Sequence, residues 1–274
     1  MPETGRLLSL AALTVLELPP TQAITVASAC GYDAIGLRPL AATPHEAQYD
    51  MLHDAVLQRQ LRDTLRGCGL GVLDLEIVRL TPHMDWPLLH RLADFAGELG
   101  AKRLLVADND PDPARAHDHL AALAQLGQAV GLTPHLEFMP WTHAPNLAAA
   151  KARITGIANC QLLIDAFHLA RSGGSPADIP PGDADIGYIQ LCDIAGPIPP
   201  MDEILREARS DRLMPGMGEI DLPALLARLP GLPISLEIPA DRLRDTGHDA
   251  AARARMAIDH ARAVLRQTEA QGGV

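Results

Sequence analysis

The sequence predicts one (β/α)8 barrel that spans residues 1–274. Eight short apolar segments alternate with longer segments of helical periodicity, and no low-complexity linker divides the chain. Most of the apolar segments are hydrophobic almost throughout, as expected of parallel strands buried on both faces. Eight such units in 274 residues fit the usual size of an α/β barrel. A doubly wound open sheet is the alternative, but the segment LELPPTQA, after the first apolar run, lacks the Gly-rich phosphate loop of that fold.

The expected strands are short apolar runs bounded by glycine, proline or polar residues. The first run has no basic stretch before it and is too short to span a bilayer, so we interpret it as a buried strand and not as a signal peptide or anchor. In chain order the eight strands are Leu7–Leu18, Asp33–Pro39, Gly71–Leu80, Arg103–Asp108, Pro134–Met139, Gln161–Phe167, Gly187–Asp193 and Pro233–Pro239.

The expected helices place apolar residues three and four positions apart, and several end in glycine, the preferred residue just past a helix C-terminus. They cover residues 45–69, 86–100, 113–131, 221–230 and 248–267.

Composition and charge narrow the range of functions. The formal net charge of −11 argues against non-specific binding of nucleic acid or anionic membranes, which requires a basic surface. The four cysteines, Cys30, Cys68, Cys160 and Cys192, are widely spaced and form no CxxC pair, which is typical of a reduced, cytoplasmic protein. The sequence leaves the oligomeric state open, and a homo-oligomer is compatible with it.

Polar side chains occur at four successive expected strands, each among apolar residues. Glu137, Asp165 and Glu237 end the fifth, sixth and eighth strands, and the seventh carries Gln190. Active sites of α/β barrels lie at the carboxyl ends of the strands, so these groups are expected to meet at the barrel mouth. Three carboxylates in a dry site repel one another unless some are protonated or a cation lies among them. Oxygen ligands favour one Mg²⁺ or Mn²⁺ ion, with Zn²⁺ or Co²⁺ as further candidates.

A single acid at a strand end also has a simpler interpretation, as a helix N-cap or as the ion-pair partner of a loop arginine. Four polar groups at successive strand ends are poorly explained in this way. The metal site is therefore the favoured interpretation.

Two histidines lie near these groups in the sequence. His168 falls three residues after Asp165, where it could bind substrate, move a proton, orient a carboxylate or simply lie on the surface of a loop. His135 has the strand parity of Glu137 and is expected to point the same way, one layer deeper. It is either a hydrogen-bond donor to the site or a core histidine.

Two arginines are candidates for binding an anionic group of a substrate. Arg212 precedes a Gly-rich turn, PGMGE, and Arg38 ends the second expected strand. The alternative for Arg212 is a solvated side chain beside a turn. Glu76, inside the third strand, is expected to be a buried acid behind the site or a partner of Arg79 or Arg38.

Five segments together resemble the xylose isomerase-like barrel superfamily of sugar phosphate isomerases and epimerases. The resemblance covers nearly the whole chain, and it implies that Glu137, Asp165, Gln190 and Glu237 bind the metal and that His168 contacts substrate. The segments are HLEFMPW, LLIDAFHLARSGG, YIQLCDIAG, RLMPGMGEIDL and SLEIP.

One position departs from the pattern of the ketose 3-epimerases in this superfamily. Those enzymes usually carry a histidine on the seventh strand, where this chain has Gln190. A Glu, Asp, Gln, Glu set resembles the 3-dehydroshikimate dehydratase branch.

The expected chemistry begins with a metal that polarises a carbonyl and its neighbouring hydroxyl, so that the α-hydrogen becomes acidic and the enolate is stabilised. Glu137, Glu237 or His168 would act as the base. Return of the proton gives an isomerase or epimerase, which is the expected class, and loss of a β-hydroxyl gives a dehydratase, which is the alternative. The expected substrate is a small polyhydroxylated carbonyl compound, with or without a phosphate or carboxylate group.

Other functions have less support in the sequence. A Schiff-base aldolase needs a lysine at a strand end, whereas Lys102 and Lys151, the two lysines of the chain, precede the fourth strand and lie in a helix. A glycoside hydrolase could use Asp108 and Asp193, but the chain has only two tryptophans to hold sugars. The multi-zinc DNA-repair endonucleases of the superfamily need more histidines and a basic groove. A non-catalytic binding barrel would turn over no carbonyl substrate.

Overall fold

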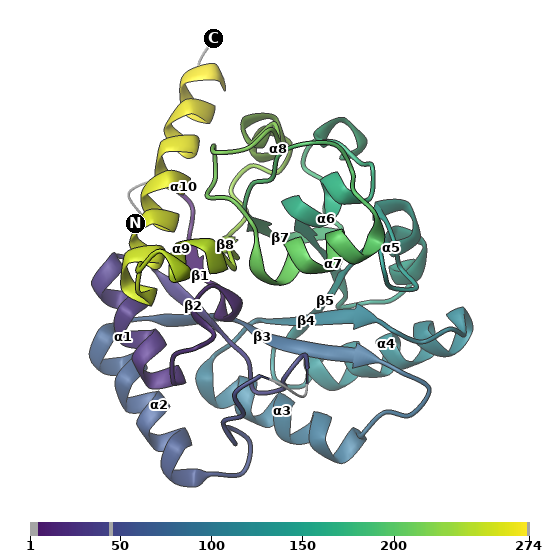
Figure 1. The fold of residues 1–274 in the computed structure, drawn as a ribbon. Coiled ribbons are helices and arrows are strands. Elements are labelled where there is room, and N and C mark those ends of the chain that lie inside the picture. Colours follow the sequence, from purple (N-terminus) through teal and green to yellow (C-terminus); the bar gives the residue numbers. More distant parts are fainter. Residues whose placement is uncertain (1–4, 44–45, 273–274) are drawn as a thin grey trace.

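Eight parallel strands close into a barrel that is surrounded by helices in the computed structural model, which describes residues 5–43 and 46–272 (Figure 1). The order of strands around the barrel is their order in the chain, and β8 pairs with β1. This confirms the predicted (β/α)8 barrel. The strands are β1 Leu8–Leu10, β2 Ala34–Leu37, β3 Gly71–Leu80, β4 Arg103–Asp108, β5 Thr133–Glu137, β6 Gln161–Asp165, β7 Ile186–Leu191 and β8 Ile234–Leu236.

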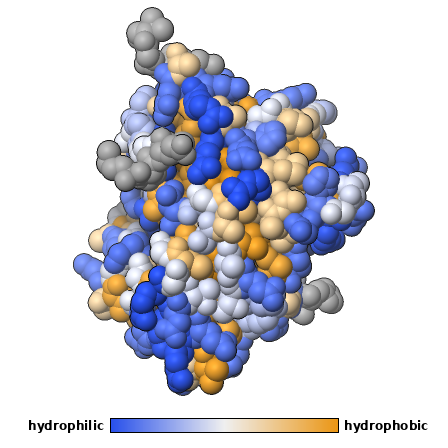
Figure 2. Space-filling view, turned by 90° about the vertical axis from the view of Figure 1, so that its left-hand side faces the viewer, coloured by the Kyte–Doolittle hydropathy of each residue, from blue (hydrophilic) through white to orange (hydrophobic). Residues whose placement is uncertain are grey.

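The helices pack on the outside of the barrel, and α10 contacts both α1 and α8, which completes the ring (Figure 1). Hydrophilic side chains cover much of the face shown in Figure 2, as expected of helices that bury one side against strands. The helices are α1 Pro20–Cys30, α2 Ala55–Cys68, α3 Trp86–Leu99, α4 Pro113–Gln128, α5 Leu147–Ile154, α6 Ala166–Arg171, α7 Met201–Ser210, α8 Leu222–Arg228, α9 Asp241–Asp245 and α10 Ala250–Gly272, with 3₁₀ turns η1 Ala12–Val15 and η2 Pro176–Asp178.

The first strand is much shorter than predicted. β1 ends at Leu10, and the chain then turns into η1 instead of continuing as a strand to Leu18. The Thr14 hydroxyl donates to the Leu236 carbonyl and accepts the Ile238 N–H, each at 2.8 Å, which fastens η1 to the end of β8. The apolar character of this segment therefore reflects burial of η1 and not a longer strand.

The helix predicted over residues 45–69 is also too long at its start. Helix α2 begins at Ala55, because Asp54 caps it by accepting the N–H groups of Val56 and Leu57. Residues 46–54 form turns and irregular structure, and residues 44–45 lie outside the described part of the chain.

Strand β3 changes its register against β4 along its length. Leu75 pairs with Leu104 and Val78 with Val106, so three steps along β3 correspond to two along β4. Arg79 lies five positions after Asp74, and regular alternation would place them on opposite faces of the sheet. Instead, Asp74 accepts the hydroxyl of Tyr188 on β7 and Arg79 lines a cavity at the mouth, so both face the interior.

A second buried cluster of apolar side chains, which includes Leu105, Leu163 and Tyr188, fills the inside of the barrel. These side chains close the barrel below its mouth, so a ligand inside the barrel can lie only at the carboxyl ends of the strands. In the described residues no helix combines the length and apolar character that crossing a membrane requires.

Candidate active site at the barrel mouth

A cavity of about 560 Å³ opens at the carboxyl ends of the strands. Glu137, His168, Arg212, Glu237 and Arg38 line it, which are five of the seven residues predicted for the site. Asp165 and Gln190, the other two, are fully buried. The structure thus brings the predicted site residues to one end of the barrel.

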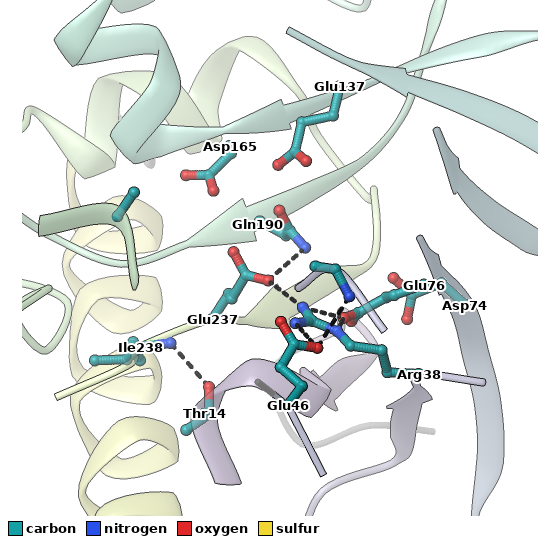
Figure 3. A network of polar contacts seen from close by, with 12 residues as sticks. Thr14, Arg38, Glu46, Asp74, Glu76, Glu137, Asp165, Gln190, Glu237 and Ile238 are labelled. Atoms are coloured by element: carbon teal, nitrogen blue, oxygen red, sulfur yellow. Dashed lines mark hydrogen bonds and ion pairs between the residues drawn. The ribbon is translucent and has the colours of Figure 1, made fainter. Parts of the chain in front are cut away.

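The four predicted metal ligands converge from four neighbouring strands (Figure 3). Glu137 and Asp165 are the last residues of β5 and β6, and Glu237 directly follows β8. Asp165 pairs in register with Gln190 on β7. The strand ends therefore place three carboxylates and one amide around a common space.

Asp165 performs two structural tasks as well. Its Oδ1 accepts the N–H of Phe167 at 2.7 Å and so caps α6, and its Oδ2 lies 2.7 Å from an Arg212 nitrogen. Both simpler interpretations of a strand-end acid, helix cap and ion-pair partner, are thus realised at this residue. Oδ2 also lies 3.6 Å from His168 Nε2.

Glu237 is held from three sides. Arg212 lies 3.0 Å from Oε2, the Gln190 amide donates to Oε1 at 3.3 Å, and Arg38 lies 3.9 Å from the same oxygen. Burial raises the pKa of Glu237 to about 7, against the lowering effect of the two arginines.

Glu137 is less well compensated. Its Oε1 is buried without a hydrogen-bond partner, and its nearest ion-pair contact is His168 Nε2 at 3.6 Å. Burial, followed by repulsion from Glu237 and Asp165, holds the pKa of Glu137 well above its usual range. A cation at this place would relieve the repulsion.

His168 lies in the first turn of α6 and is buried, with Nε2 at 3.6 Å from both Glu137 and Asp165. Trp141 and Phe167 pack edge-on against its ring. Burial lowers the pKa of His168 to about 4, so the imidazole is neutral at neutral pH. A neutral imidazole can accept a proton or bind a metal.

Three side chains that could hold a metal ion overlap in part with the set expected from the sequence. Among the described His, Cys, Asp and Glu residues, Glu137, Asp165 and His168 offer ligand atoms within 4.8 Å of one another. Gln190 Oε1 is also buried without a partner. Carboxylate and amide oxygens together with an imidazole suit a divalent ion.

The two arginines predicted to bind a substrate anion are both tied to internal acids. Arg212 bridges Asp165 and Glu237, and its guanidinium lies over the Phe167 ring at 4.8 Å. Arg38 donates to Glu76 Oε2 through two nitrogens at 2.7 and 3.0 Å.

The structure also decides between the two partners considered for Glu76. Glu76 pairs with Arg38, whereas Arg79 donates to the Asn109 side chain and the Ala42 carbonyl. His135 lies one layer below Glu137 as predicted, where its ring packs edge-on against Tyr188 and its Nδ1 lies 2.8 Å from the Thr133 carbonyl. These contacts make it a core histidine.

The residues of the rival functions have structural partners outside the cavity. Asp108 pairs with Arg153 at 2.8 Å, and Asp193 accepts backbone N–H groups of the loop that follows α7. Lys151 pairs with Asp183. None of these acids or lysines lines the cavity.

Sequence reasoning did not identify four of the arginines that line the cavity, Arg79, Arg209, Arg244 and Arg253, nor the ring of Trp141, which also lines it. The place of Arg79 near the end of the third predicted strand is a signal by which it could have been assigned to the site. Arg209 lies in a helix that the apolar pattern did not reveal.

Fold and site together define a class of protein, the α/β barrels whose mouth gathers carboxylates and an imidazole suited to a divalent ion. The chain belongs to the xylose isomerase-like TIM barrel family, which it matches over residues 24–266. This confirms the resemblance inferred from the sequence motifs.

Among curated proteins, a 3-dehydroshikimate dehydratase of Pseudomonas putida is 29% identical over 218 residues, covering 71% of this chain. The chain spans 33% of the length of that relative.

Two solved structures show the same fold. An IolI protein with a bound zinc atom has a TM-score of 0.78 at 19% identity, covering 95% of this chain and 98% of its own. A D-allulose 3-epimerase from Methylomonas sp., solved in complex with D-allulose, has a TM-score of 0.66 at 19% identity, covering 94% of this chain and 97% of its own.

Proposed function

We propose that the protein is a divalent-metal-dependent enzyme that removes the proton α to a carbonyl of a small polyhydroxylated acid and then eliminates a β-hydroxyl. The observation that carries this proposal is the asymmetry of the site. On one side, Glu137 and His168 have no arginine partner within ion-pair distance among the described residues. On the other side, Glu237 is held by Arg212 and Gln190. An elimination needs one base that is free to take a proton, whereas epimerisation needs proton transfer at two faces of one carbon. The asymmetry of the site therefore favours the elimination.

The metal would be held by Glu137, Asp165, Gln190 and Glu237. The buried, unpartnered oxygens of Glu137 and Gln190 support this donor set. When bound, the ion would supply Lewis acidity at the substrate carbonyl. The proposed ion is Mg²⁺ or Mn²⁺, with Co²⁺ and Zn²⁺ as alternatives.

His168 is proposed as the base. Its imidazole is neutral at neutral pH and lines the cavity next to the carboxylates. In the proposed step the α C–H bond breaks, its proton passes to His168, and its electron pair forms a double bond to the carbonyl carbon while the π pair of the carbonyl moves onto its oxygen. The carbonyl then re-forms, the electron pair shifts to the bond between the α and β carbons as the β C–O bond breaks, and the hydroxyl takes the proton held by His168 and leaves as water. Trp141 and Phe167, packed against the ring, would fix its orientation.

A second candidate, an isomerase or epimerase, is favoured by one specific observation. Glu137 and Glu237, from β5 and β8, both line the cavity. They could exchange a proton with two faces of one carbon, the chemistry expected first from the sequence.

The test uses the metal-loaded protein in D₂O with two probes, 3-dehydroshikimate and D-allulose. The proposal expects 3-dehydroshikimate to lose one molecule of water. Deuterium incorporation into D-allulose without loss of water would instead establish the epimerase. Turnover that leaves the α-hydrogen in place would overturn both.

The role of His168 is tested with a matched pair of variants. We expect His168→Gln to lower kcat by about 10²–10⁴, the range for a general base, and to retain the metal. Asp165→Asn should lose metal as well as activity. Loss of metal from His168→Gln, measured by elemental analysis, would make His168 a ligand and refute its role as the base.

A further inference from the structure

Six arginines line the cavity, and four of them are held by carboxylates. A guanidinium that already faces an internal acid has little net charge to offer a ligand. The held arginines are Arg38 with Glu76 and Glu46, Arg212 with Asp165 and Glu237, Arg244 with Asp241 and Asp245, and Arg253 with Glu17.

Arg79 differs from these four because only neutral oxygens hold it. One guanidinium nitrogen donates to Asn109 Oδ1 at 3.1 Å and another to the Ala42 carbonyl at 3.5 Å. Within the described chain no carboxylate lies within ion-pair distance of it. The register shift in β3 aims this side chain into the cavity, where it is only partly exposed. Its position is therefore fixed by neutral groups, and Glu137, the acid whose charge acts on it most, lies beyond ion-pair distance.

Arg209 is the second cavity arginine that has no carboxylate within ion-pair distance among the described residues. It lies in the last turn of α7, is exposed, and lines the same cavity. It forms neither a hydrogen bond nor an ion pair through its side chain with any residue in the described ranges. Both guanidinium groups line one cavity. Burial lowers the pKa of Arg79, the charge of Glu137 raises it, and the charges of Arg38 and Arg209 add smaller lowering effects.

Two like charges at one end of a pocket repel each other until an anion joins them, and the planar guanidinium fork fits the oxygens of a carboxylate or phosphate. We propose that Arg79 and Arg209 form the oxyanion subsite that selects the acidic group of the substrate. Arg38 and Arg212 then position the carboxylates of the metal site. This inference rests on the proposed function, because it assumes that the cavity holds the substrate.

The test compares Arg79→Gln and Arg209→Gln with Arg244→Gln. Arg244 lines the same cavity but is paired with acids on α9, so it is the matched control. The Arg79→Gln substitution keeps a hydrogen-bonding side chain near Asn109. For 3-dehydroshikimate we expect each of the first two variants to raise KM by about 10-fold or more, with kcat changed less than about threefold and metal content unchanged. Arg244→Gln should change KM less than about twofold, as expected of an exposed pair.

Binding measured without turnover separates this inference from the proposed function. Calorimetry with inorganic phosphate and with 3-dehydroshikimate, on protein loaded with metal, distinguishes a phosphate subsite from a carboxylate subsite. A lower affinity in the Arg79 and Arg209 variants supports the subsite, even if no α-proton exchange is found. Absence of α-proton exchange would refute the proposed function but not the subsite. Equal affinity in all three variants, or turnover of D-allulose with no oxyanion bound, would overturn the subsite and leave the enolate chemistry standing.

Discussion

The buried carboxyl group of Asp74 depends on neighbouring residues for its hydrogen bond and for the space it occupies. It is fully buried inside the barrel, where Oδ2 accepts the Tyr188 hydroxyl at 3.0 Å and Oδ1 has no partner. Glycine at position 36 leaves room for this carboxyl, because a Cβ there would lie 2.7 Å from Asp74 Oδ1 and 2.9 Å from Glu76 Oε1. The missing side chain on β2 thus allows two acids to lie side by side on β3.

Burial, repulsion from Glu76 and repulsion from Glu237 hold the pKa of Asp74 well above its usual value, against the hydrogen bond from Tyr188 and the charge of Arg103. The folded state therefore keeps a proton that the unfolded chain releases above about pH 4, and stability is lost as the pH rises. Asp74→Asn cannot ionise and still accepts the Tyr188 hydroxyl. We expect the difference in free energy of unfolding between Asp74→Asn and the parent to increase, in favour of the variant, by up to about 1.4 kcal/mol per pH unit above pH 4.

Urea unfolding of both proteins across the acidic and neutral range checks this prediction. The exposed Asp94→Asn is the control and should show no such slope. A difference between Asp74→Asn and the parent that stays constant with pH would contradict the shifted pKa.

At the scale of single residues, the sequence predicts the acids of the site better than the arginines. Glu137, Asp165 and Glu237 stand out because a charged group ends an apolar strand. The free charge of Arg79 and Arg209 does not stand out, because it depends on which carboxylates lie near each guanidinium in space. Arg212 resembles a loop arginine in the sequence, yet it is buried between two acids.

At the scale of elements, one aspartate organises the loop between α7 and α8. Asp193 follows β7 and accepts four backbone N–H groups at 2.9–3.1 Å, from Ile194, Gly216, Gly218 and Ile220. A Cβ at Gly218 would lie 2.4 Å from Asp193 Oδ1, so glycine is required for the close approach. The PGMGE turn is thus a structural feature built around a buried carboxylate.

Asp193→Ala removes all four of these acceptors. Hydrogen bonds to a charged group contribute about 1.5–3 kcal/mol each, and their effects overlap, so we expect a loss of at least about 3 kcal/mol in the free energy of unfolding. Urea unfolding measures the loss, and limited proteolysis should cut the loop faster. Asp178→Ala, which removes an exposed capping acid, is the control. An equal cost for the two variants would show that Asp193 does not hold the loop.

Element boundaries could be predicted where the apolar pattern coincides with the backbone. β3 and β4 have the predicted bounds because their apolar runs are strands from end to end. Helix α1 was missed, since Ile24, Thr25 and Val26 favour strands in isolation. Helix α7 was missed because it buries only Ile204 and Ala208, which is too few for a visible period.

At the scale of the whole molecule, the proposed metal should stabilise the fold by mass action. Buried carboxylates that repel one another destabilise the metal-free protein, and an ion that binds only the folded state adds about 2.7 kcal/mol at 100 times its Kd. We expect Mn²⁺ to raise the Tm of the chelated protein by several degrees.

Thermal unfolding with and without Mn²⁺ checks this expectation in three proteins. Asp165→Asn should lose the metal-dependent rise. Asp108→Asn, at a buried acid paired with Arg153 outside the cavity, should keep it. A rise of equal size in both variants would mean that the ion binds elsewhere.

Under the proposed oxyanion subsite, the register shift in β3 makes the spacing of this strand a determinant of ligand charge. One extra residue between Leu75 and Val78 sets the direction of every side chain from there to Leu80. Loss of Val78, just past the shift and with the shift retained, would keep the same barrel and the same four candidate ligands, yet place Arg79 in the outward-facing position of Val78. A single deletion would then change the preference from acidic to neutral ligands, with no substitution among the candidate metal ligands. Two barrels of this family with identical candidate ligands can therefore differ in substrate charge for a reason that only the spacing within β3 reveals.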